Sequence, residues 1–417
     1  MTTPPGELLV SPGPLLLAGI GEDQSYAAHH AREGALPQLS VEDLLALTSS
    51  AAVRGRGGAA FPFATKLSAA ADGVRRPVVV VNAAEGEPAS AKDSVLLRTV
   101  PHRVLDGAVL AARALGTREI HVVTSEDRPE TEEAVTKAVH ERRGEGIRWR
   151  HQHAEGRFVS GQARAVIELM SGRVGLPVTA WKPEAMDGYK GRPTLLSNAE
   201  TFAHLGVLVR RGPGAYAAHG TAEEPGTTLL TIATVLPDGQ LGGAAPHVIE
   251  VEHGTPFAAV LSSPQLDAPA LLGGYHGTWV GPGSLRELTV SHCALRDRGL
   301  TIGAGVVLPL TDGSCPVART AELAAYLADE SAGRCGPCRL GLPTLADELA
   351  ALASGADRRH RIAEVAGLVE RRGACAHPDG TARLARSLIA LEGVVEAHLD
   401  GACRCGRGQV RQLRRSA

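Results

Sequence analysis

The sequence predicts three regions in order: a parallel α/β domain, a small β-rich domain and a C-terminal helical domain. Strand-like apolar runs alternate with amphipathic helical stretches over roughly 40–205, which is typical of a parallel sheet. Residues 227–300 carry short strand-like runs, glycine-rich turns and little helical pattern, and from residue 321 the pattern is helical again. A chain of 417 residues with 44% hydrophobic content is long enough for two or three cores.

The α/β region is expected to begin with a helix at Ser40. Ser40 and Asp43 fit a helix-capping pattern, and Leu44 and Leu45 follow as the first apolar pair. Further on, valine-rich runs and amphipathic stretches alternate. They predict strands at 77–81 and 119–124 and helices at 101–115 and 130–142. Residues 1–39, ahead of the first helix, are expected to be irregular.

The two later regions differ in their periodicity. Short strands are predicted at 228–231 and 247–251. Helices are predicted at 321–328, 342–352, 361–369 and 382–398. The domain boundaries that follow are 1–39 for the N-terminal segment, 40–220 for the α/β domain, 221–300 for the β-rich domain and 301–417 for the helical domain.

Charge and hydropathy exclude several classes of protein. A net charge of −2 with 21% charged residues suits neither a nucleic-acid-binding protein nor a disordered chain. No stretch approaches the roughly 20 apolar residues that span a bilayer. The N-terminus lacks a basic start and is interrupted by proline, so it is a poor signal peptide. We therefore expect a cytoplasmic protein that meets a membrane only through a partner.

A glycine-rich loop follows the first predicted helix. It reads RGRGGAAFP over 54–62. Consecutive glycines let backbone N–H groups approach a bound anion, and Arg56 and Lys66 add positive charge. Alone, such a loop is weak evidence, because an isolated glycine-rich run is more often a flexible connection between a helix and a strand. It is not a dinucleotide-binding fingerprint, because no strand leads directly into it.

A second polar segment directly follows the first predicted strand. Asn82, Glu85 and Glu87 lie in the turn NAAEGEP. Ligands of open α/β sheets bind at the carboxyl ends of strands, so these side chains could hydrogen-bond a polar ring edge or ribose hydroxyls. The alternative is a solvated turn.

Taken together, these segments resemble the flavoprotein subunit of respiratory complex I and the related subunits of NAD-linked hydrogenases and formate dehydrogenases. That family carries RGRGGAGFP where this chain has RGRGGAAFP, and NADEGEPG followed by KDR where this chain has NAAEGEPAS followed by KDS. Its next Pro-His pair corresponds to Pro101 and His102, and its GKPTVVNNVET resembles GRPTLLSNAET at 191–201. The resemblance runs in one order from about Ser40 to Cys375.

The resemblance implies a Rossmann-like FMN domain, a β-grasp domain of the SLBB type and a C-terminal helical bundle that holds a [4Fe–4S] cluster. It implies that FMN is lined by Gly55, Arg56, Gly57, Gly58, Lys66, Asn82, Glu85, Ser197 and Asn198. Phe61 and Glu87 would face NADH. No residue is assigned a catalytic role, because the flavin carries the electron chemistry and the protein positions it.

The chain departs from the family pattern beside the expected flavin. The aspartate of NADEGEP is Ala84 here, and the family's CGEETAL loop has Gln162 and Ala163 in place of its two glutamates. An amide and a methyl group remove negative charge next to the isoalloxazine and acceptors for the nicotinamide amide. NADH binding is therefore more affected by these replacements than flavin binding.

The cysteine region also departs from the family. Seven cysteines are present, five of them from Cys335 onward, and clustered cysteines in a cytoplasmic chain indicate metal or redox chemistry. The family's SCGxCxPCR begins with a ligand that is Ala332 here, which leaves Cys335, Cys338 and Cys375. Three thiolates suit a [3Fe–4S] cluster, or a [4Fe–4S] cluster with one other ligand. Cys403 or Cys405 could supply it if the tail folds back.

Other interpretations of these cysteines stay open. Cys335-Gly336-Pro337-Cys338 is also the thioredoxin string, but a helical stretch precedes it instead of a strand. Zinc is a second alternative, because the three cysteines and His377 suit a tetrahedral site. A relic site without metal is a third.

The remaining cysteines and histidine pairs have plainer expected roles. Cys293 and Cys315 are expected to fill core space. The pairs His29–His30 and His151–His153 lie in polar sequence and are expected to be solvated.

Three hypotheses for function follow. In the first, NADH or NADPH reduces FMN, which passes single electrons to the cysteine-bound cluster. In the second, the protein relays electrons between a ferredoxin and a partner, such as a membrane-bound redox protein, without a nicotinamide. The replacements at Gln162 and Ala163 favour the second, whereas Phe61 and Glu87 favour the first. A protein that kept the fold and lost its cofactors is the third, and the glycine loop and cysteines argue against it.

Overall fold

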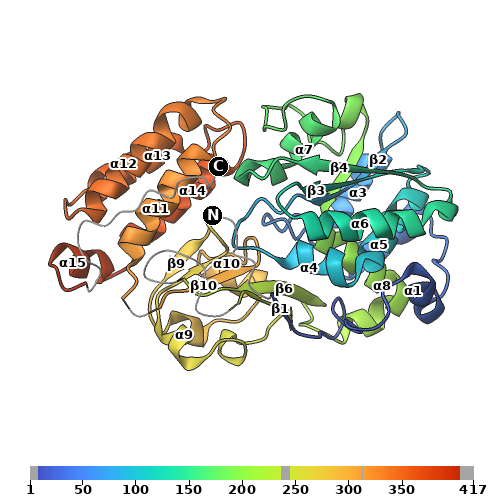
Figure 1. The fold of residues 1–417 in the computed structure, drawn as a ribbon, viewed down its shortest axis with the longest axis horizontal. Helices are drawn as coiled ribbons and strands as arrows, with labels where there is room; N and C mark the ends of the chain where they lie inside the picture. Colours follow the sequence, from blue (N-terminus) through green and yellow to red (C-terminus); the bar gives the residue numbers. More distant parts are fainter. Residues whose placement is uncertain (1–7, 236–244, 312, 404–417) are drawn as a thin grey trace.

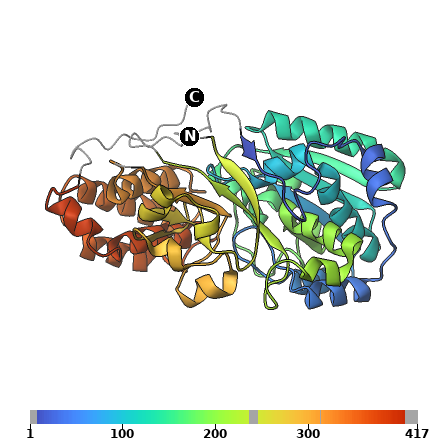
Figure 2. The same ribbon diagram turned by 90° about the horizontal axis from the view of Figure 1, so that it is seen from below.

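A computed structural model describes residues 8–235, 245–311 and 313–403 of the chain. The α/β region lies at one end of the molecule and the C-terminal helices at the other, as Figure 1 shows. A second sheet lies between them, and the view in Figure 2 shows the same order. Along the chain, the α/β region is thus followed by a second sheet and then by helices.

A four-stranded parallel sheet forms the α/β region. Its strand order is β4-β3-β2-β5, and every neighbouring pair is parallel. The bounds are Val78–Ala83 for β2, Glu119–Ser125 for β3, Arg148–Ala154 for β4 and Thr194–Asn198 for β5. Strand β2 comes first in the chain and lies between β3 and β5, so the winding direction reverses beside it. Such a reversal opens a crevice at the carboxyl ends of the two central strands.

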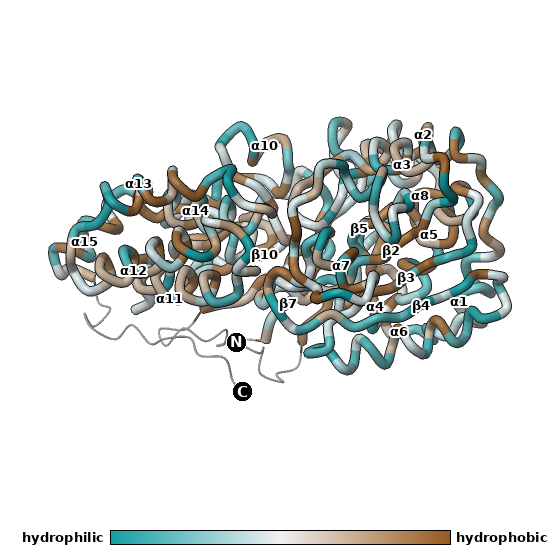
Figure 3. The backbone as a smooth tube through the Cα atoms, turned by 90° about the horizontal axis from the view of Figure 1, so that it is seen from above, coloured by the Kyte–Doolittle hydropathy of each residue, from teal (hydrophilic) through white to brown (hydrophobic). Residues whose placement is uncertain are grey.

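Helices cover both faces of this sheet. They are α2 (Val41–Ser50), α3 (Phe63–Ala71), α4 (Lys92–Thr99), α5 (Pro101–Ala114), α6 (Pro129–Glu141), α7 (Ala163–Met170) and α8 (Ala199–Ala217). The hydrophobic colour in Figure 3 runs through β2 and β3, whereas α6 on the outside is largely hydrophilic. Helices α5 and α8 approach so closely that a Cβ on Gly107 would lie 1.8 Å from the carbonyl oxygen of Phe202. Glycine is therefore needed at that contact.

The predictions for this region are largely confirmed. The strands at 77–81 and 119–124 appear as β2 and β3, and the helices at 101–115 and 130–142 appear as α5 and α6. Ser40 caps α2 in a capping box with Asp43. The prediction that residues 1–39 are irregular is wrong in part, because β1 (Leu9–Val10) and α1 (Tyr26–Glu33) form there.

The second sheet has six strands of mixed direction. Its order is β1-β7-β6-β10-β8-β9, with β6 at Thr227–Ile232, β7 at His247–Glu252, β8 at Ala270–Leu272, β9 at Thr278–Val280 and β10 at Val306–Pro309. The short helices α9 (Ser263–Asp267) and α10 (His292–Asp297) flank it. Strands β1 and β10 lie outside 221–300, so the boundary expected at residue 300 falls within this sheet unit.

The expectation of solvated histidine pairs is wrong for two residues. His29 is only 3% exposed, and its Nε2 lies 2.8 Å from Asp106 Oδ2. His151 is on β4, where its Nε2 lies 2.8 Å from Thr124 Oγ1. Burial lowers the pKa of His151 to about 4, with His153 beside it. These two histidine side chains therefore make hydrogen bonds inside the protein instead of facing solvent.

The C-terminal helices pack on one another around an apolar core. They are α11 (Pro316–Asp329), α12 (Leu342–Ala353), α13 (Arg359–Val369), α14 (His377–Ile389) and α15 (Val394–Leu399). The single helix predicted at 382–398 is broken, because Gly393 takes a left-handed φ of 72° between α14 and α15. Within the described ranges, none of the helices is both long and apolar enough to cross a membrane.

Candidate functional site

The ends of β2 and β5 meet at the crevice where the winding reverses. Asn82 pairs with Asn198 and Val81 with Ser197, at the carboxyl ends of the two strands. The glycine loop lies against them, since a Cβ on Gly57 would meet Asn198 Cβ at 3.8 Å. Segments far apart in the sequence therefore converge at the position where open α/β sheets bind ligands.

Positive charge and an exposed ring border this crevice. Lys66 Nζ lies 3.3 Å from both Glu184 Oε1 and the carbonyl oxygen of Leu196, the residue before Ser197. Arg54 Nε is buried and has no hydrogen-bond partner among the described residues. Phe61 is 45% exposed although it is a large apolar side chain. Glycine backbone beside the positive charge of Lys66 suits a phosphate-bearing cofactor with an aromatic ring, a description that fits FMN.

Arg56 points its side chain away from the crevice, which differs from the implied flavin-lining role. The guanidinium donates hydrogen bonds to His253 Nε2 at 3.0 Å, His292 Nε2 at 3.3 Å and the carbonyl oxygen of Thr227 at 2.9 Å. Burial and the Arg56 charge hold the pKa of His253 well below its usual value and that of His292 at about 4. Both rings are therefore neutral acceptors, and Arg56 binds the glycine loop to the second sheet.

Glu85 is also engaged within the protein. Its Oε1 accepts hydrogen bonds from the Asp93 N–H at 2.9 Å and the Ser90 hydroxyl at 2.9 Å, and its Oε2 accepts from the Ser94 N–H at 3.1 Å. The carboxylate thus caps the N-terminus of α4, where orphan N–H groups favour an anion. Its implied contact with FMN through the side chain is not what the structure shows.

Sequence reasoning missed a buried charge network beneath the crevice. Lys92 Nζ lies 2.9 Å from Asp93 Oδ1, 3.1 Å from Glu200 Oε2 and 3.0 Å from Asn198 Oδ1. Burial alone would lower the pKa of Lys92, but the two carboxylates raise it. Asn198 also caps α8 by accepting from the Glu200 N–H at 3.0 Å. The side chain of Asn198 is therefore held by the scaffold, and the KDS segment at 92–94 was the signal for this network.

Glu87 faces the second sheet across the crevice. Its Oε2 accepts a hydrogen bond from the Tyr275 N–H at 2.9 Å, and its Oε1 accepts from the Ala89 N–H at 3.3 Å. Burial, helped by the nearby Glu85 charge, raises the pKa of Glu87 to about 8. This carboxyl group is therefore mostly neutral at pH 7.

The turn before α7 completes this side of the crevice. Asn82 Nδ2 donates a hydrogen bond to the carbonyl oxygen of Gly161 at 2.8 Å. The next two residues, Gln162 and Ala163, begin α7. A Cβ on Gly86 would lie 2.4 Å from the carbonyl oxygen of Phe158, so the β2 turn and this turn are in close contact. The two neutral replacements are thus placed directly beside Asn82.

An aromatic cluster connects the crevice to the C-terminal helices. Phe158 lies 4.6 Å from His276 and 5.4 Å from His377 between ring centroids. His276 Nε2 is 3.1 Å from His377 Nδ1, and Tyr275 packs against Tyr326. The sequence carries no signal for this cluster, because its members come from four separate segments that only the tertiary fold brings together.

The cysteine region docks onto the same turn. The Phe158 N–H donates to Glu330 Oε2 at 2.9 Å, and Arg157 Nη2 donates to the carbonyl oxygen of Ser331 at 3.2 Å. Cys335 follows four residues after Ser331. The segment that carries the predicted cluster ligands therefore begins at the edge of the crevice.

The three predicted cluster ligands lie in one neighbourhood. Cys335 Sγ and Cys338 Sγ are 3.3 Å apart, and burial together with the charge of nearby Cys335 raises the pKa of Cys375. Burial and the neighbouring Cys335 thiol raise the pKa of Cys338 to about 11. A cationic iron centre would deprotonate thiols placed in this way and bind them as thiolates.

Cys403 does not supply the missing fourth thiolate. It lies beside Cys315 and His398, and Cys315 is the residue immediately before α11. Cys335 follows the C-terminal end of this helix, whose 14 residues span about 21 Å. The hypothesis that Cys403 folds back onto the cluster is therefore wrong, and Cys405 lies outside the described residues.

Comparisons with known proteins match these features. The family model for the Nuo51 FMN-binding domain matches residues 48–206, and that for the NADH-ubiquinone oxidoreductase-F iron–sulfur binding region matches 318–391. An NADH-quinone oxidoreductase subunit of Rhizobium meliloti (strain 1021) is 27% identical over 369 residues, covering 81% of this chain and 82% of that protein. The mitochondrial NADH dehydrogenase [ubiquinone] flavoprotein 1 of Dictyostelium discoideum is 26% identical, covering 81% and 74%.

A solved structure has the same fold. One chain of an NAD⁺-reducing [NiFe]-hydrogenase in the air-oxidized state aligns with a TM-score of 0.78 and 25% identity, covering 94% of this chain and 68% of that one. The two matched regions contain the glycine loop, the strand ends and the three cysteines, and they support FMN and an iron–sulfur cluster as cofactors. The chain therefore belongs, as a divergent member, to the family of flavoprotein subunits of NADH-quinone oxidoreductase.

Proposed function

We propose that this protein is the component of a redox complex at which electrons from NAD(P)H enter through FMN and leave through the cysteine-bound cluster. The observation that carries the proposal is the docking of the cysteine region on the crevice, through the hydrogen bonds of Phe158 to Glu330 and of Arg157 to Ser331. Bound FMN would supply the conversion between two-electron and one-electron transfer. The protein's own residues position it and separate it from water.

Individual residues take these tasks. The backbone of Gly55, Gly57 and Gly58, with Lys66, Asn82 and Ser197, would hold FMN. Three further side chains would act without contacting FMN. Arg56 holds the glycine loop in place, Glu85 holds α4 and Asn198 holds α8. Cys335, Cys338 and Cys375 would hold the cluster, and the missing ligand at Ala332 favours a [3Fe–4S] cluster or a [4Fe–4S] cluster with one other ligand.

The two smaller regions would keep the roles that the resemblance implies. The six-stranded mixed sheet would be the β-grasp domain of the SLBB type, and α11–α15 would be the helical bundle of the cluster. The position of the sheet between the other two regions supports this division.

A nicotinamide donor is supported by two features. Phe61 offers an exposed ring at the crevice, and the neutral Glu87 can donate as well as accept a hydrogen bond. The matched relatives are named as parts of NADH-quinone oxidoreductase, which supports the same donor.

A second candidate is a relay that uses no nicotinamide. The turn beside Asn82 carries Gln162 and Ala163, so the crevice lacks the family's two carboxylates there. In this alternative the donor is a ferredoxin and the acceptor a partner protein that is itself membrane-bound. Both candidates place the protein in the cytoplasm.

Anaerobic spectroscopy tests the proposal. Protein purified without oxygen should contain FMN and three to four iron atoms per chain, and NADH or NADPH should bleach the flavin band. Bleaching by dithionite or by a reduced ferredoxin, but not by either nicotinamide, would replace the first candidate with the second. A protein that lacks both flavin and iron would contradict both.

A further inference from the structure

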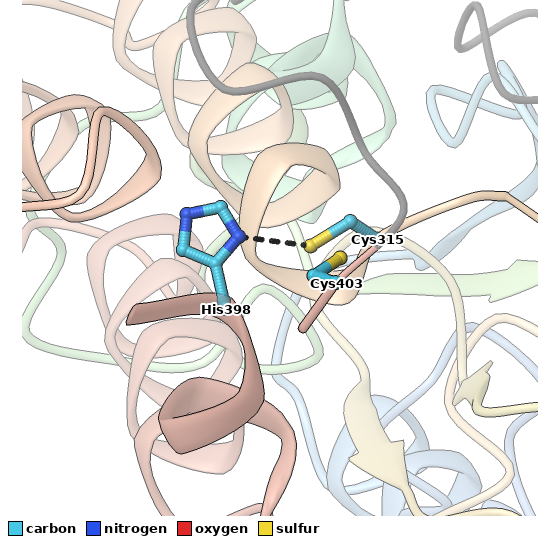
Figure 4. Close-up of side chains that lie close together, drawn as sticks. All are labelled: Cys315, His398 and Cys403. Carbon is cyan, nitrogen blue, oxygen red and sulfur yellow. Dashed lines mark hydrogen bonds between the residues drawn. The ribbon is translucent and has the colours of Figure 1, made fainter. Parts of the chain in front are cut away.

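A group of three metal-ligand side chains lies at the end of α11 that is remote from the cluster cysteines. Cys315, His398 and Cys403 point their ligand atoms toward one another, as Figure 4 shows. These atoms all lie within 4.8 Å of one another, and Cys315 Sγ is 3.4 Å from His398 Nδ1. Cys315 and His398 are buried, with 4% and 1% exposure. The group therefore forms an enclosed site built from two parts of the chain, the beginning of α11 and the end of α15 with the residues after it.

The spacing suits a single zinc ion. Tetrahedral zinc with Zn–S distances of about 2.3 Å and Zn–N distances of about 2.0 Å requires S···N separations of about 3.5 Å and S···S separations of about 3.8 Å. The observed 3.4 Å between Cys315 and His398 is close to the first value. Two thiolates and an imidazole are also the ligand types that zinc prefers.

The histidine ring is already oriented for metal binding. His398 Nε2 lies 3.0 Å from the carbonyl oxygen of Ala353, at the end of α12. A carbonyl oxygen only accepts, so Nε2 carries the proton and the lone pair of Nδ1 faces Cys315. Metal-ligating histidines are held in this manner, with one nitrogen on the ion and the other N–H bonded to a carbonyl or carboxylate.

The backbone after α15 brings the second cysteine back to the histidine. Gly401 takes a left-handed φ of 77°, which suits a glycine at the end of a helix. The Cys403 N–H then donates to the carbonyl oxygen of Ala397 at 3.0 Å. Cys403 is thus held against the last turn of α15, close to His398. At the opposite side, Cys315 stands at the N-terminus of α11, where the helix dipole favours a thiolate.

We propose that Cys315, His398 and Cys403 bind one structural Zn²⁺ ion. The ion would join the beginning of α11 to α15, and through the Ala353 hydrogen bond to the end of α12. This site is separate from the redox cofactors, because the length of α11 lies between it and Cys335.

Metal content and zinc absorption spectroscopy of the full-length, anaerobically purified protein test the site. We expect about one zinc per chain, with Zn–S distances of about 2.3 Å from at least two sulfur atoms and at least one Zn–N distance of about 2.0 Å. The zinc edge is read separately from iron and flavin. Protein that contains no zinc, and binds none after incubation with zinc chloride and dialysis, would overturn the proposal, as would a mapped disulfide between Cys315 and Cys403.

Variants distinguish this site from the iron site. Cys403→Ser and His398→Gln should lose most of their zinc, at least about tenfold in affinity, while they keep flavin and iron. Cys338→Ser should lose iron and keep zinc, and Cys293→Ser should keep both. Zinc that persists in Cys403→Ser and His398→Gln but disappears in Cys338→Ser belongs to the other cysteines and rejects the assignment. If the zinc-site variants do not fold, the ligand count from the wild-type spectrum decides.

Discussion

The amide of Asn82 donates a hydrogen bond of 2.8 Å to the carbonyl oxygen of Gly161. This bond joins the end of a central strand to the turn that leads into α7, so the side chains that follow Gly161 lie at the crevice where we propose that FMN binds. Those side chains are Gln162 and Ala163, and both are neutral. The geometry therefore makes the replacement of two carboxylates an electrostatic change at the cofactor.

The double variant Gln162→Glu/Ala163→Glu should lower the flavin midpoint potential. Negative charge near the ring disfavours added electrons, and about 1.4 kcal/mol of such repulsion corresponds to about 30 mV for a two-electron couple. We expect a shift of this order or larger in an anaerobic spectroelectrochemical titration. The neutral variant Gln162→Leu serves as the control and should shift the potential by much less. An unchanged potential in the double variant would show that the turn does not face the flavin.

Glu87 should make the protein less stable as pH rises. Its pKa is raised from 4.5 to about 8 in the folded state, so the folded protein holds a proton that the unfolded chain loses across this interval. The contribution of this proton to the free energy of unfolding is complete below about pH 4.5 and is lost as pH passes through about 8. The variant Glu87→Gln has no proton to lose, so its stability relative to wild type should rise by about 4 kcal/mol from about pH 5 to about pH 9.

Urea unfolding at several pH values measures this difference. Glu126→Gln, which changes an exposed carboxylate, is the matched control and should follow wild type at every pH. A gap between Glu87→Gln and wild type that is the same at both ends of the pH range would show that Glu87 ionises normally in the folded protein.

Ala332→Cys should change the cluster. The substitution restores a thiol at the position where the family has its first ligand, next to Ser331, whose carbonyl oxygen is bound by Arg157. Four thiolates complete a [4Fe–4S] site, so iron should rise from about three to about four atoms per chain. Electron paramagnetic resonance should then show a signal in the reduced rather than the oxidised protein. Ala332→Ser adds an oxygen in place of sulfur, and an equal effect from it would argue against cysteine ligation.

Arg56→Ala should destabilise the protein rather than simply weaken flavin binding. Arg56 is only 7% exposed. Its guanidinium donates hydrogen bonds to His253, His292 and the carbonyl oxygen of Thr227. Removal of one partner from a buried charged network costs about 3–5 kcal/mol. Arg98→Ala removes a mostly exposed arginine and should cost less than about 1 kcal/mol. Normal stability of Arg56→Ala, measured by urea unfolding, would contradict the role assigned to Arg56.

The sequence predicted the order of the three regions and the strands that frame the crevice because these depend on local periodicity. The valine run of β2 and the capping box at Ser40 are local signals of this kind. Family resemblance located the glycine loop and the cysteines. Neither local periodicity nor the resemblance could show which side chains make hydrogen bonds within the protein. For this reason Arg56 and Glu85 were expected at the flavin, although both are bound to other residues of the chain.

Contacts between distant segments account for the remaining differences. His276 and His377 meet at 3.1 Å, although they are 101 positions apart in the chain. Cys403 meets Cys315 rather than Cys335 because α11 is a rigid spacer between the two cysteines. Strand β1 belongs to the second sheet because Leu9 pairs with His247, a pairing for which a two-residue strand carries no periodic signal.

This last pairing has a consequence for synthesis of the chain. Strand β1 leaves the ribosome before the α/β region, but β7, the strand with which it pairs, is made only after the whole α/β region. At about 5–20 residues per second, the interval between Leu9 and His247 lasts roughly 10–50 seconds. During that time the α/β region can fold as a unit, while the N-terminal segment waits unpaired. The β1–β7 pairing of the second sheet therefore forms late, between a segment made early and one made much later.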